Sequence, residues 1–208
     1  MNNKLCLLAL ISLTTLVACE DDTPTVDVPS DPPQITVDSP WQFTIKIDGT
    51  TFTAKDSTNS YIGSYATAGL VAPFPDTSAL IYESSLSDSL ITNSLFISKG
   101  TLRFASGMIP HDTIFVPFFI PASYPYSPNS ADGVVIEWFD ANGELWSTDL
   151  GSANQTGSAF VIKEIKTSYI NAYLDVRLKA TFNCTLYNSS GQSKALTEGT
   201  YVGSFEAI

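Results

Sequence analysis

Apolar and polar residues alternate with a period of two through most of the chain beyond residue 40. Phe43, Ile45 and Ile47, for example, are each followed by a polar residue. Such alternation predicts a strand that is buried on one face. Asp48-Gly49 follows at once and predicts a hairpin turn, because glycine accepts the positive φ that a tight turn needs. The same pattern predicts further strands over 51–54, 61–67, 79–84, 94–98, 101–105, 113–120, 134–139, 144–148, 160–167, 174–187 and 200–205.

Details of three of these segments extend the prediction. Lys99-Gly100 is expected to form a turn between two short strands, and Pro117 marks 113–120 as an edge strand or a bulge. Asn142-Gly143 predicts the clearest hairpin of the chain, with Phe139 facing Trp146 across the strands. No helical stripe exceeds two turns. The fold class expected from these short strands is all-β, an antiparallel β-sandwich, with a β-barrel as the alternative.

A different pattern precedes this region. Lys4 is followed by an uncharged and mostly apolar run of 13 residues, Leu5 to Val17. A transmembrane helix needs about 20 such residues, so the run is typical of the apolar region of a secretory signal. Residues 20–40 contain five prolines among acidic and small residues. This composition cannot bury a core, and it predicts a disordered tether.

The apolar run ends in Leu16-Val17-Ala18-Cys19, which resembles the lipobox of bacterial lipoproteins. The resemblance implies cleavage before Cys19, a diacylglycerol on its thiol and a further acyl chain, such as palmitate, on its α-amine. Several acyl chains anchor a protein firmly, since each buried CH₂ contributes about 0.8 kcal/mol. Glu20-Asp21-Asp22 resembles the acidic export signal of Bacteroidota lipoproteins, which implies the outer face of the outer membrane. An ordinary signal peptide with an acidic tether is the alternative.

These segments divide the chain into a signal peptide over 1–18, a lipidated cysteine and tether over 19–40, and one domain over 41–208. The last part is long enough to bury a core. Its opening residues 46–54 and its closing segments 178–182 and 198–201 resemble Bacteroidota surface lipoproteins that carry a single β-sandwich domain of unknown function. The resemblance implies a fold and a location, and it brings no catalytic residue with it.

The charge balance narrows the possible partners. The chain has 21 acidic and 10 basic residues and a net charge of −11, and six of the acids lie between Glu20 and Asp38. Without a basic patch, binding to nucleic acid is disfavoured, as is a polybasic contact with anionic lipid. The acidity favours solubility. The expected contact with the membrane is therefore the lipid anchor alone.

Cysteine and histidine offer little chemistry beyond Cys19. Cys6 leaves with the signal peptide, so Cys184 is the single cysteine of the domain and has no partner for an intrachain disulfide. It lies on the apolar face of a predicted strand, which indicates a buried thiol. His111 is the only histidine, and a triad or a multi-histidine metal site needs more. No cofactor and no metal site are predicted.

Four acidic residues gather around the predicted 134–148 hairpin: Glu137, Asp140, Glu144 and Asp149. A glycosidase needs two carboxyl groups about 5–9 Å apart on either side of the scissile bond. Acids that flank a turn are more often solvated, and strands rather than helices flank this turn, so a calcium loop is disfavoured as well. The acids keep open a glycan hydrolase as the alternative to a non-enzymatic protein.

Aromatic residues are the candidates for ligand binding. Tyr124 and Tyr126 lie in a proline-bounded loop, where exposed rings can stack on sugars or on a partner. Trp138 and Trp146 are further candidates. The competing interpretation is that the tryptophans belong to the core and that the tyrosines pack the loop against the domain.

Three short motifs match the acceptor sequence of Bacteroidota O-glycosylation, in which aspartate precedes a hydroxyl residue. The candidate acceptors are Ser57, Ser89 and Thr113.

The sequence as a whole predicts a lipid-anchored protein on the outer face of the outer membrane. We expect it to be non-enzymatic and to bind an extracellular glycan or an envelope protein. The alternatives are the carboxylate-based glycan hydrolase and a structural, fimbria-like subunit.

Overall fold

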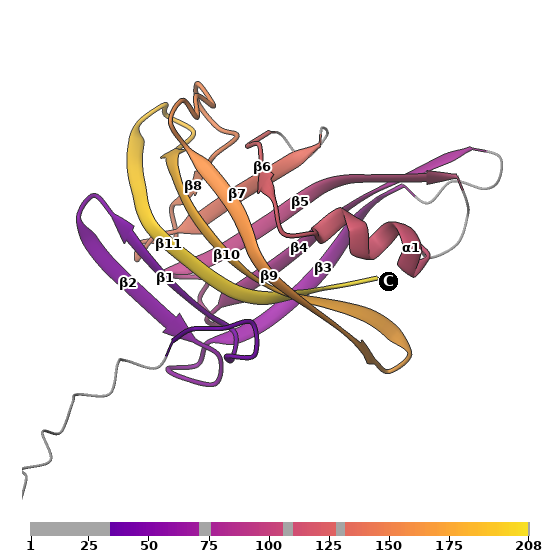
Figure 1. Cartoon of the computed structure of the whole chain (residues 1–208). Coiled ribbons are helices and arrows are strands. Elements are labelled where there is room, and N and C mark those ends of the chain that lie inside the picture. The colour runs from indigo at the N-terminus through magenta and orange to yellow at the C-terminus, as the bar shows by residue number, and fades with distance from the viewer. Residues whose placement is uncertain (1–33, 71–75, 106–109, 128–131, 208) are drawn as a thin grey trace, which may run out of the picture. The chain divides into compact units, whose positions relative to one another are not determined.

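The computed structural model describes residues 34–70, 76–105, 110–127 and 132–207 (Figure 1). The predicted signal peptide, Cys19 and most of the predicted tether lie outside these residues. The folded unit begins at Ile35. This is six residues before the predicted start at Trp41, so the last part of the expected tether belongs to the domain. No helix in the described part is long and apolar enough to cross a membrane.

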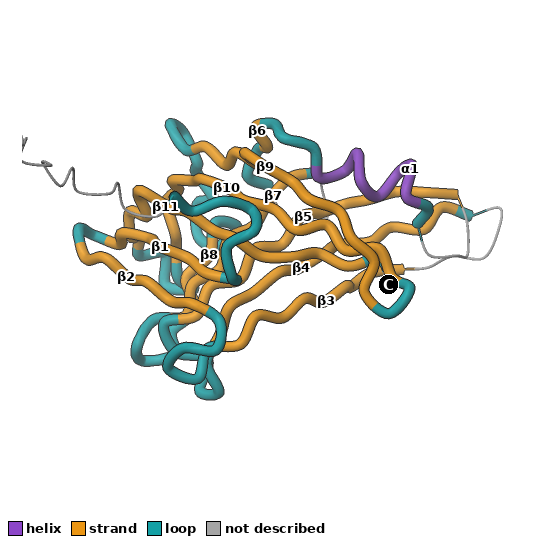
Figure 2. Tube along the Cα trace, turned by 60° about the horizontal axis from the view of Figure 1, so that its bottom comes forward, coloured by secondary structure: helices purple, strands orange, loops and turns teal. Residues whose placement is uncertain are grey.

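Strands make up most of the described chain, and one short helical segment lies between β5 and β6 (Figure 2). The strands and helices in chain order are β1 (Gln42–Ile47), β2 (Thr50–Lys55), β3 (Ile62–Leu70), β4 (Thr77–Ser87), β5 (Ser94–Ala105), α1 (Asp112–Phe115), the 3₁₀ helix η1 (Val116–Phe119), β6 (Ser123–Tyr124), β7 (Gly133–Phe139), β8 (Leu145–Ser147), β9 (Ala159–Ile170), β10 (Tyr173–Tyr187) and β11 (Ser193–Glu206).

The strands form one antiparallel sheet in the order β2-β1-β11-β10-β8-β7-β5-β4-β3. β9 pairs with the free edge of β10, and β6 pairs with β9. The order is that of an open sheet, with β2 and β3 at its edges. The predicted all-β sandwich is confirmed, because the sheet curls so that strands far apart in this order face each other. Tyr201 of β11 and Ser84 of β4, five positions apart in this order, share a buried 2.8 Å hydrogen bond.

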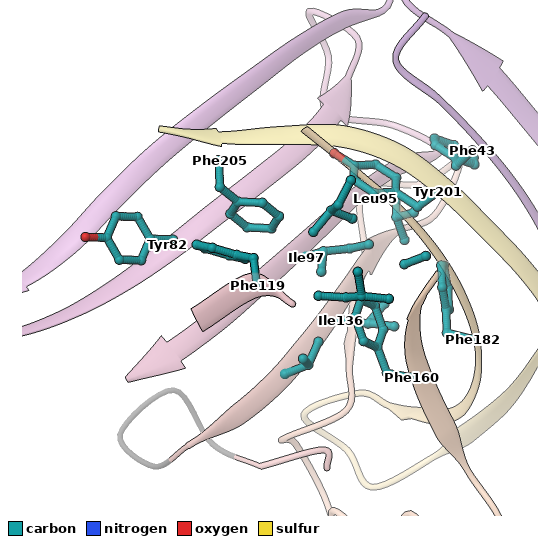
Figure 3. Packing of buried hydrophobic residues seen from close by; sticks show 14 of the residues in the cluster. Phe43, Tyr82, Leu95, Ile97, Phe119, Ile136, Phe160, Phe182, Tyr201 and Phe205 are labelled. Carbon is teal, nitrogen blue, oxygen red and sulfur yellow. The ribbon is translucent and has the colours of Figure 1, made fainter. Parts of the chain in front are cut away.

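A single hydrophobic core fills the space between the facing parts of the sheet (Figure 3). Phe119 of η1 stacks on Phe205 of β11 with their ring centroids 4.7 Å apart, and Tyr82 of β4 packs against Phe119 from another side. These three rings are almost completely buried. The helical segment therefore covers one part of the core that the strands leave open.

The predicted strand over 113–120 is wrong, because this segment forms α1 and η1. The Nδ1 atom of His111 accepts a hydrogen bond from the backbone N–H of Thr113 and caps the helix. Pro117 lies at the start of η1, where a missing N–H costs little. Phe115 and Phe119, four residues apart, point to the same side and are fully buried. This helical spacing of two large rings prevails over the β propensity of their neighbours.

The predicted turn at Lys99-Gly100 is also wrong. The two predicted strands on either side of it form one continuous strand, β5. An irregularity does lie at this position: Leu80 of β4 pairs with Leu102 and Tyr82 pairs with Lys99, so Gly100 and Thr101 of β5 lie opposite Ile81 alone. A bulge on β5 thus stands where the turn was predicted, and the strand continues past it.

The hairpin of β7 and β8 is present, but its register is shifted from the predicted one. Trp138 faces Trp146, and Phe139 faces Leu145. The connection has three residues rather than two, because the backbone N–H of Asp140 donates to the carbonyl of Glu144. Its last residue is a glycine at φ +74°, as is usual for three-residue hairpin loops. The extra residue changes which side chains lie opposite each other.

The contact between Tyr201 and Ser84 provides a test of the curled sheet. Tyr201→Phe leaves the buried Ser84 hydroxyl without its partner, so we expect the free energy of unfolding to fall by about 1–3 kcal/mol. Urea denaturation measures this loss. In the control Tyr187→Phe, the lost hydroxyl donates to the Asn154 carbonyl at an exposed site, and a change within about 0.5 kcal/mol is expected. Equal losses in the two variants would contradict a role for the hydrogen bond in joining β11 and β4.

Candidate ligand-binding site

The two candidate tyrosines hold their loop against the domain. The hydroxyl of Tyr126 donates to the carbonyls of Ala159 and Asn183 at 3.2 and 3.0 Å. The hydroxyl of Tyr124 donates to the carbonyl of Ile120 at 2.8 Å. Burial raises the pKa of both phenols. Tyr126 therefore acts as a structural anchor, and Tyr124 leaves only part of its ring accessible.

The two candidate tryptophans lie in the core. Trp138 is 1% exposed and packs edge-on against Phe43, and Trp146 is 5% exposed. The indole N–H of Trp146 donates to Asp140, and the ammonium of Lys194 lies 3.7 Å from the Trp146 ring centroid. Neither indole offers a free face to a ligand, which agrees with the interpretation as core residues.

The four candidate acids do not converge on a cleft of their own. Asp140 accepts hydrogen bonds from two backbone N–H groups of its turn and from Lys194. Glu144 accepts from Asn188, and Asp149 accepts from Ser147. Glu137 is half-buried, and its pKa is raised by burial and by the nearby carboxylates of Glu83 and Asp149. Three of the four candidates thus have structural partners.

The remaining candidates from the sequence are His111, Cys184 and the three possible glycosylation sites. His111 caps α1, and Cys184 is buried, which raises the pKa of its thiol. Within the described ranges, no group of three or more His, Cys, Asp or Glu residues is placed to hold a metal ion. The candidate glycosylation sites all lie at exposed positions, which leaves their modification a prediction: Ser57, Ser89 and Thr113.

A cleft of about 660 Å³ lies elsewhere, where β3 approaches the paired strands β9, β10 and β11. The segment before β1 forms one of its walls. Its lining combines two aromatic rings with charged and hydroxyl side chains. The lining residues are Asp38, Pro40, Trp41, Asp56, Gly63, Tyr65, Lys166, Ser168, Ile170, Asp175, Arg177 and Ser204.

Residues 35–40, which we call the strap, lie across β9 and β10 and form one wall of the cleft. The guanidinium of Arg177 donates to the carbonyls of Val37 and Ser39. The ammonium of Lys179 donates to the carbonyl of Ile35 at 2.6 Å, and the backbone N–H of Val37 donates to the carboxylate of Glu164. Charged side chains of two neighbouring strands thus replace strand pairing in holding the strap.

Trp41 follows the strap and forms the aromatic wall of the cleft. Its ring lies directly against Gly63 of β3, where an added Cβ would come within 2.4 Å of a ring carbon. Asp56 fixes both partners, since its backbone N–H donates to the Trp41 carbonyl and its carboxylate accepts from the Gly63 N–H at 2.8 Å. The absence of a side chain at Gly63 therefore makes room for the indole. Tyr65, two residues along the same strand, is partly exposed.

Asp175 of β10 is the most unusual group in the lining. The residue is 3% exposed. Its Oδ2 accepts from the hydroxyls of Ser168 and Ser204, whereas its Oδ1 is buried and has no hydrogen-bond partner. Burial raises the pKa of this carboxyl; the two serines and Arg177 oppose the rise, and Glu206 adds to it. A buried carboxylate with one unpaired oxygen is costly to leave unsatisfied.

The arrangement is suited to holding a polar ligand. The two rings offer apolar faces beside the charged and hydroxyl side chains of the lining. The strap and six strands or their ends contribute residues to the lining, so sequence proximity could not bring these residues together. One signal was present: Asp175 and Arg177 alternate with apolar residues on a predicted strand, which places both on the face opposite the core.

The fold and the cleft define an all-β domain with a polar, aromatic-walled cleft beside its first strand. Comparison of the chain with family models, with curated proteins and with solved structures finds no match. The resemblance to Bacteroidota surface lipoproteins therefore stays a prediction from the sequence.

The buried carboxyl of Asp175 leads to a prediction about pH. The pKa of Asp175 in the folded chain lies above the ordinary 3.8. At a pH between 3.8 and the folded-state pKa, this carboxyl is therefore protonated more often in the folded chain than in the unfolded chain. The contribution of Asp175 to wild-type stability accordingly falls as pH rises through this window, and ionised Asp175 costs free energy above it. Asp175→Asn lacks this cost. Arg177 and Glu206, the charged neighbours of Asp175, are present in both proteins, so their own titration largely cancels in the comparison. The free energy of unfolding of Asp175→Asn relative to wild type should rise between about pH 3 and pH 7.

Urea denaturation of both proteins across that pH range measures the difference. If the free energy of unfolding of Asp175→Asn relative to wild type stayed constant with pH, or fell as pH rises, the buried environment of the carboxyl would be contradicted.

Proposed function

We propose that this chain is a lipid-anchored protein on the outer face of the outer membrane and that its cleft binds an extracellular glycan. The anchor is supported by Leu16-Val17-Ala18-Cys19 and the acidic residues after it. The observation that carries the binding function is the cleft itself. Sugars present an apolar ring face together with hydroxyl groups, and the cleft offers aromatic rings beside polar side chains.

A concave site also favours a glycan over an envelope protein, since a protein partner generally needs a larger and flatter surface. We propose no enzymatic activity. The alternative of a glycan hydrolase at the 137–149 hairpin is weakened, because Asp140, Glu144 and Asp149 hydrogen-bond within the hairpin and its surroundings. The fimbria-like subunit has no specific support among the described residues.

The lipid anchor is tested by Cys19→Ser in cells that express the full chain. Wild-type protein should incorporate an alkyne analogue of palmitate, fractionate with the membrane and be digested when intact cells are treated with protease. The variant should incorporate no label, because a hydroxyl cannot form the thioether to diacylglycerol. Cys184→Ser is the matched control and should behave as wild type. Labelling that persists in Cys19→Ser would contradict the anchor.

Glycan binding is tested with the full lipidated chain in detergent micelles on an array of bacterial and host oligosaccharides. Trp41→Ala should weaken binding of any retained glycan about five- to tenfold, as expected for the loss of about 1 kcal/mol of ring contact. Tyr65→Ala, on the edge strand β3, should weaken binding as well. Tyr173→Ala removes an exposed ring outside the cleft lining and should leave binding unchanged.

Unchanged binding in both cleft variants, or no binding to any oligosaccharide, would overturn the proposed site.

A further inference from the structure

We propose that a second pocket, separate from the cleft, binds small carboxylic acids that carry an apolar group. This pocket has a volume of about 330 Å³ and lies between β5, η1 and the segment around β6. None of its lining residues also lines the cleft, so the inference does not depend on the proposed binding of glycans. The lining residues are Lys99, Pro117, Phe118, Ile120, Ala122, Tyr124, Pro125, Asp132 and Gly133.

Lys99 supplies the ammonium group of this pocket. It lies on the core-facing side of β5, and the residue is only 4% exposed. Its Nζ atom lies 3.6 Å from the ring centroid of Phe118 and 4.2 Å from that of Tyr124. Burial lowers the pKa of this ammonium to about 8, and the charge of Asp132 opposes the fall, so the group stays protonated at neutral pH. The pocket therefore has a positive charge between two aromatic rings.

This ammonium has no anionic partner in the described part of the chain. No carboxylate there forms an ion pair with it, and no oxygen accepts a hydrogen bond from it. The two rings offset only part of the cost of removing a charge from water. Unlike the unpaired oxygen of Asp175, the Nζ atom is not fully enclosed, and it lines the pocket. A ligand in the pocket can therefore reach it.

Asp132 is the one acid among the described lining residues, and it does not take the place of a ligand. Its Oδ1 accepts a hydrogen bond from the backbone N–H of Thr101. The residue is exposed and does not approach Lys99 to ion-pair distance. Water screens a carboxylate in such a position, so it neutralises the buried ammonium only weakly.

The supply of donors favours a carboxylate over a phosphate or sulfate. Lys99 is the single cation among the described lining residues, and Pro117 and Pro125 have no backbone N–H. The hydroxyl of Tyr124 already donates to the Ile120 carbonyl at 2.8 Å. A phosphate or sulfate has more acceptor oxygens than this lining has donors. One ammonium suits one carboxylate, and a hydrogen bond between two charged groups is about twice as strong as a neutral one.

The other walls of the pocket are apolar and held in place. Prolines, aromatic rings and aliphatic side chains surround the ammonium, and Ile120 is 48% exposed. The Ala122 carbonyl accepts from the N–H of Ile162 at 2.9 Å, and the Pro125 carbonyl accepts from the N–H of Val134 at 2.9 Å. A mostly apolar, preformed pocket with one well-placed polar group is typical of small-molecule sites. The walls thus suit an aliphatic or aromatic group attached to the carboxylate.

The test uses isothermal titration calorimetry at neutral pH with the full chain in micelles of a non-ionic detergent. The ligands are 3-phenylpropionate and hexanoate, each compared with its neutral amide, and protein-free micelles serve as the blank. Each acid and its amide share the same apolar group and differ in charge. Wild-type protein should bind at least one of the acids tenfold or more tightly than its amide.

Two variants test the assignment to this pocket. Lys99→Met keeps the length of the side chain and removes its charge, so the preference for the acid should disappear. Lys55→Met removes an exposed lysine of β2 outside the pocket and is the matched control, which should keep the preference. Ile120→Glu adds a carboxylate at an exposed position of the lining. It should weaken binding of the acid at least fivefold and change binding of the amide less.

The remaining outcomes contradict the proposal. Equal affinity for acid and amide, or no binding of either, would overturn recognition of a carboxylate. A preference that survives in Lys99→Met would overturn the assignment to this ammonium. If Lys99→Met does not fold, Ile120→Glu decides, and unchanged binding of the acid by that variant would overturn the location of the site.

Discussion

The pairing of β10 along both of its edges is the interaction on which the rest of this domain depends. β11 pairs with one edge over almost the full length of the strand, and β9 pairs with the other edge from Tyr173 to Asn183. One face of β10 carries apolar side chains into the core, including Val176, Leu178 and Phe182. The opposite face carries charged residues, and these hold the strap and form part of the cleft. β10 thus contributes one face to the core and the other face to the cleft, because successive side chains of a strand point to opposite sides.

This division explains why the strap is held by charges. The apolar face of β10 is already used by the core, so a segment that crosses the other face meets Arg177, Lys179 and, from β9, Glu164. Their donors and acceptors satisfy backbone groups of the strap that have no strand partner. Charge-assisted bonds of this kind fix orientation as well as position. Because the strap is held in this position, Trp41, the next residue, packs against Gly63 and forms the aromatic wall of the cleft.

The sequence contained enough to predict the strands but little of the cleft. Period-two alternation is local, so β1 and β10 were recognisable from their one buried face. The segment 113–120 was misassigned because its β-branched and aromatic residues obscure the four-residue spacing of Phe115 and Phe119. The cleft was missed because its walls meet only after the sheet has curled. The predicted aromatic candidates lie in a proline-bounded loop and in the core, whereas the indole of the cleft directly follows a segment that its composition assigned to the tether.

The energetics of Asp175 bear on whether the cleft is an accident of packing. An aspartate with a buried, unpaired oxygen lowers the stability of the fold at neutral pH, and asparagine would fit the same space without the charge. Packing alone gives no reason to keep a carboxylate there, because the two serines can donate to an amide oxygen as well. Groups that reduce stability without helping the fold are characteristic of binding and catalytic sites, where a ligand supplies the missing interaction. The ionised carboxyl of Asp175 therefore lowers the stability of the fold without a gain in packing, which distinguishes it from the fully partnered Asp140 of the β7–β8 hairpin.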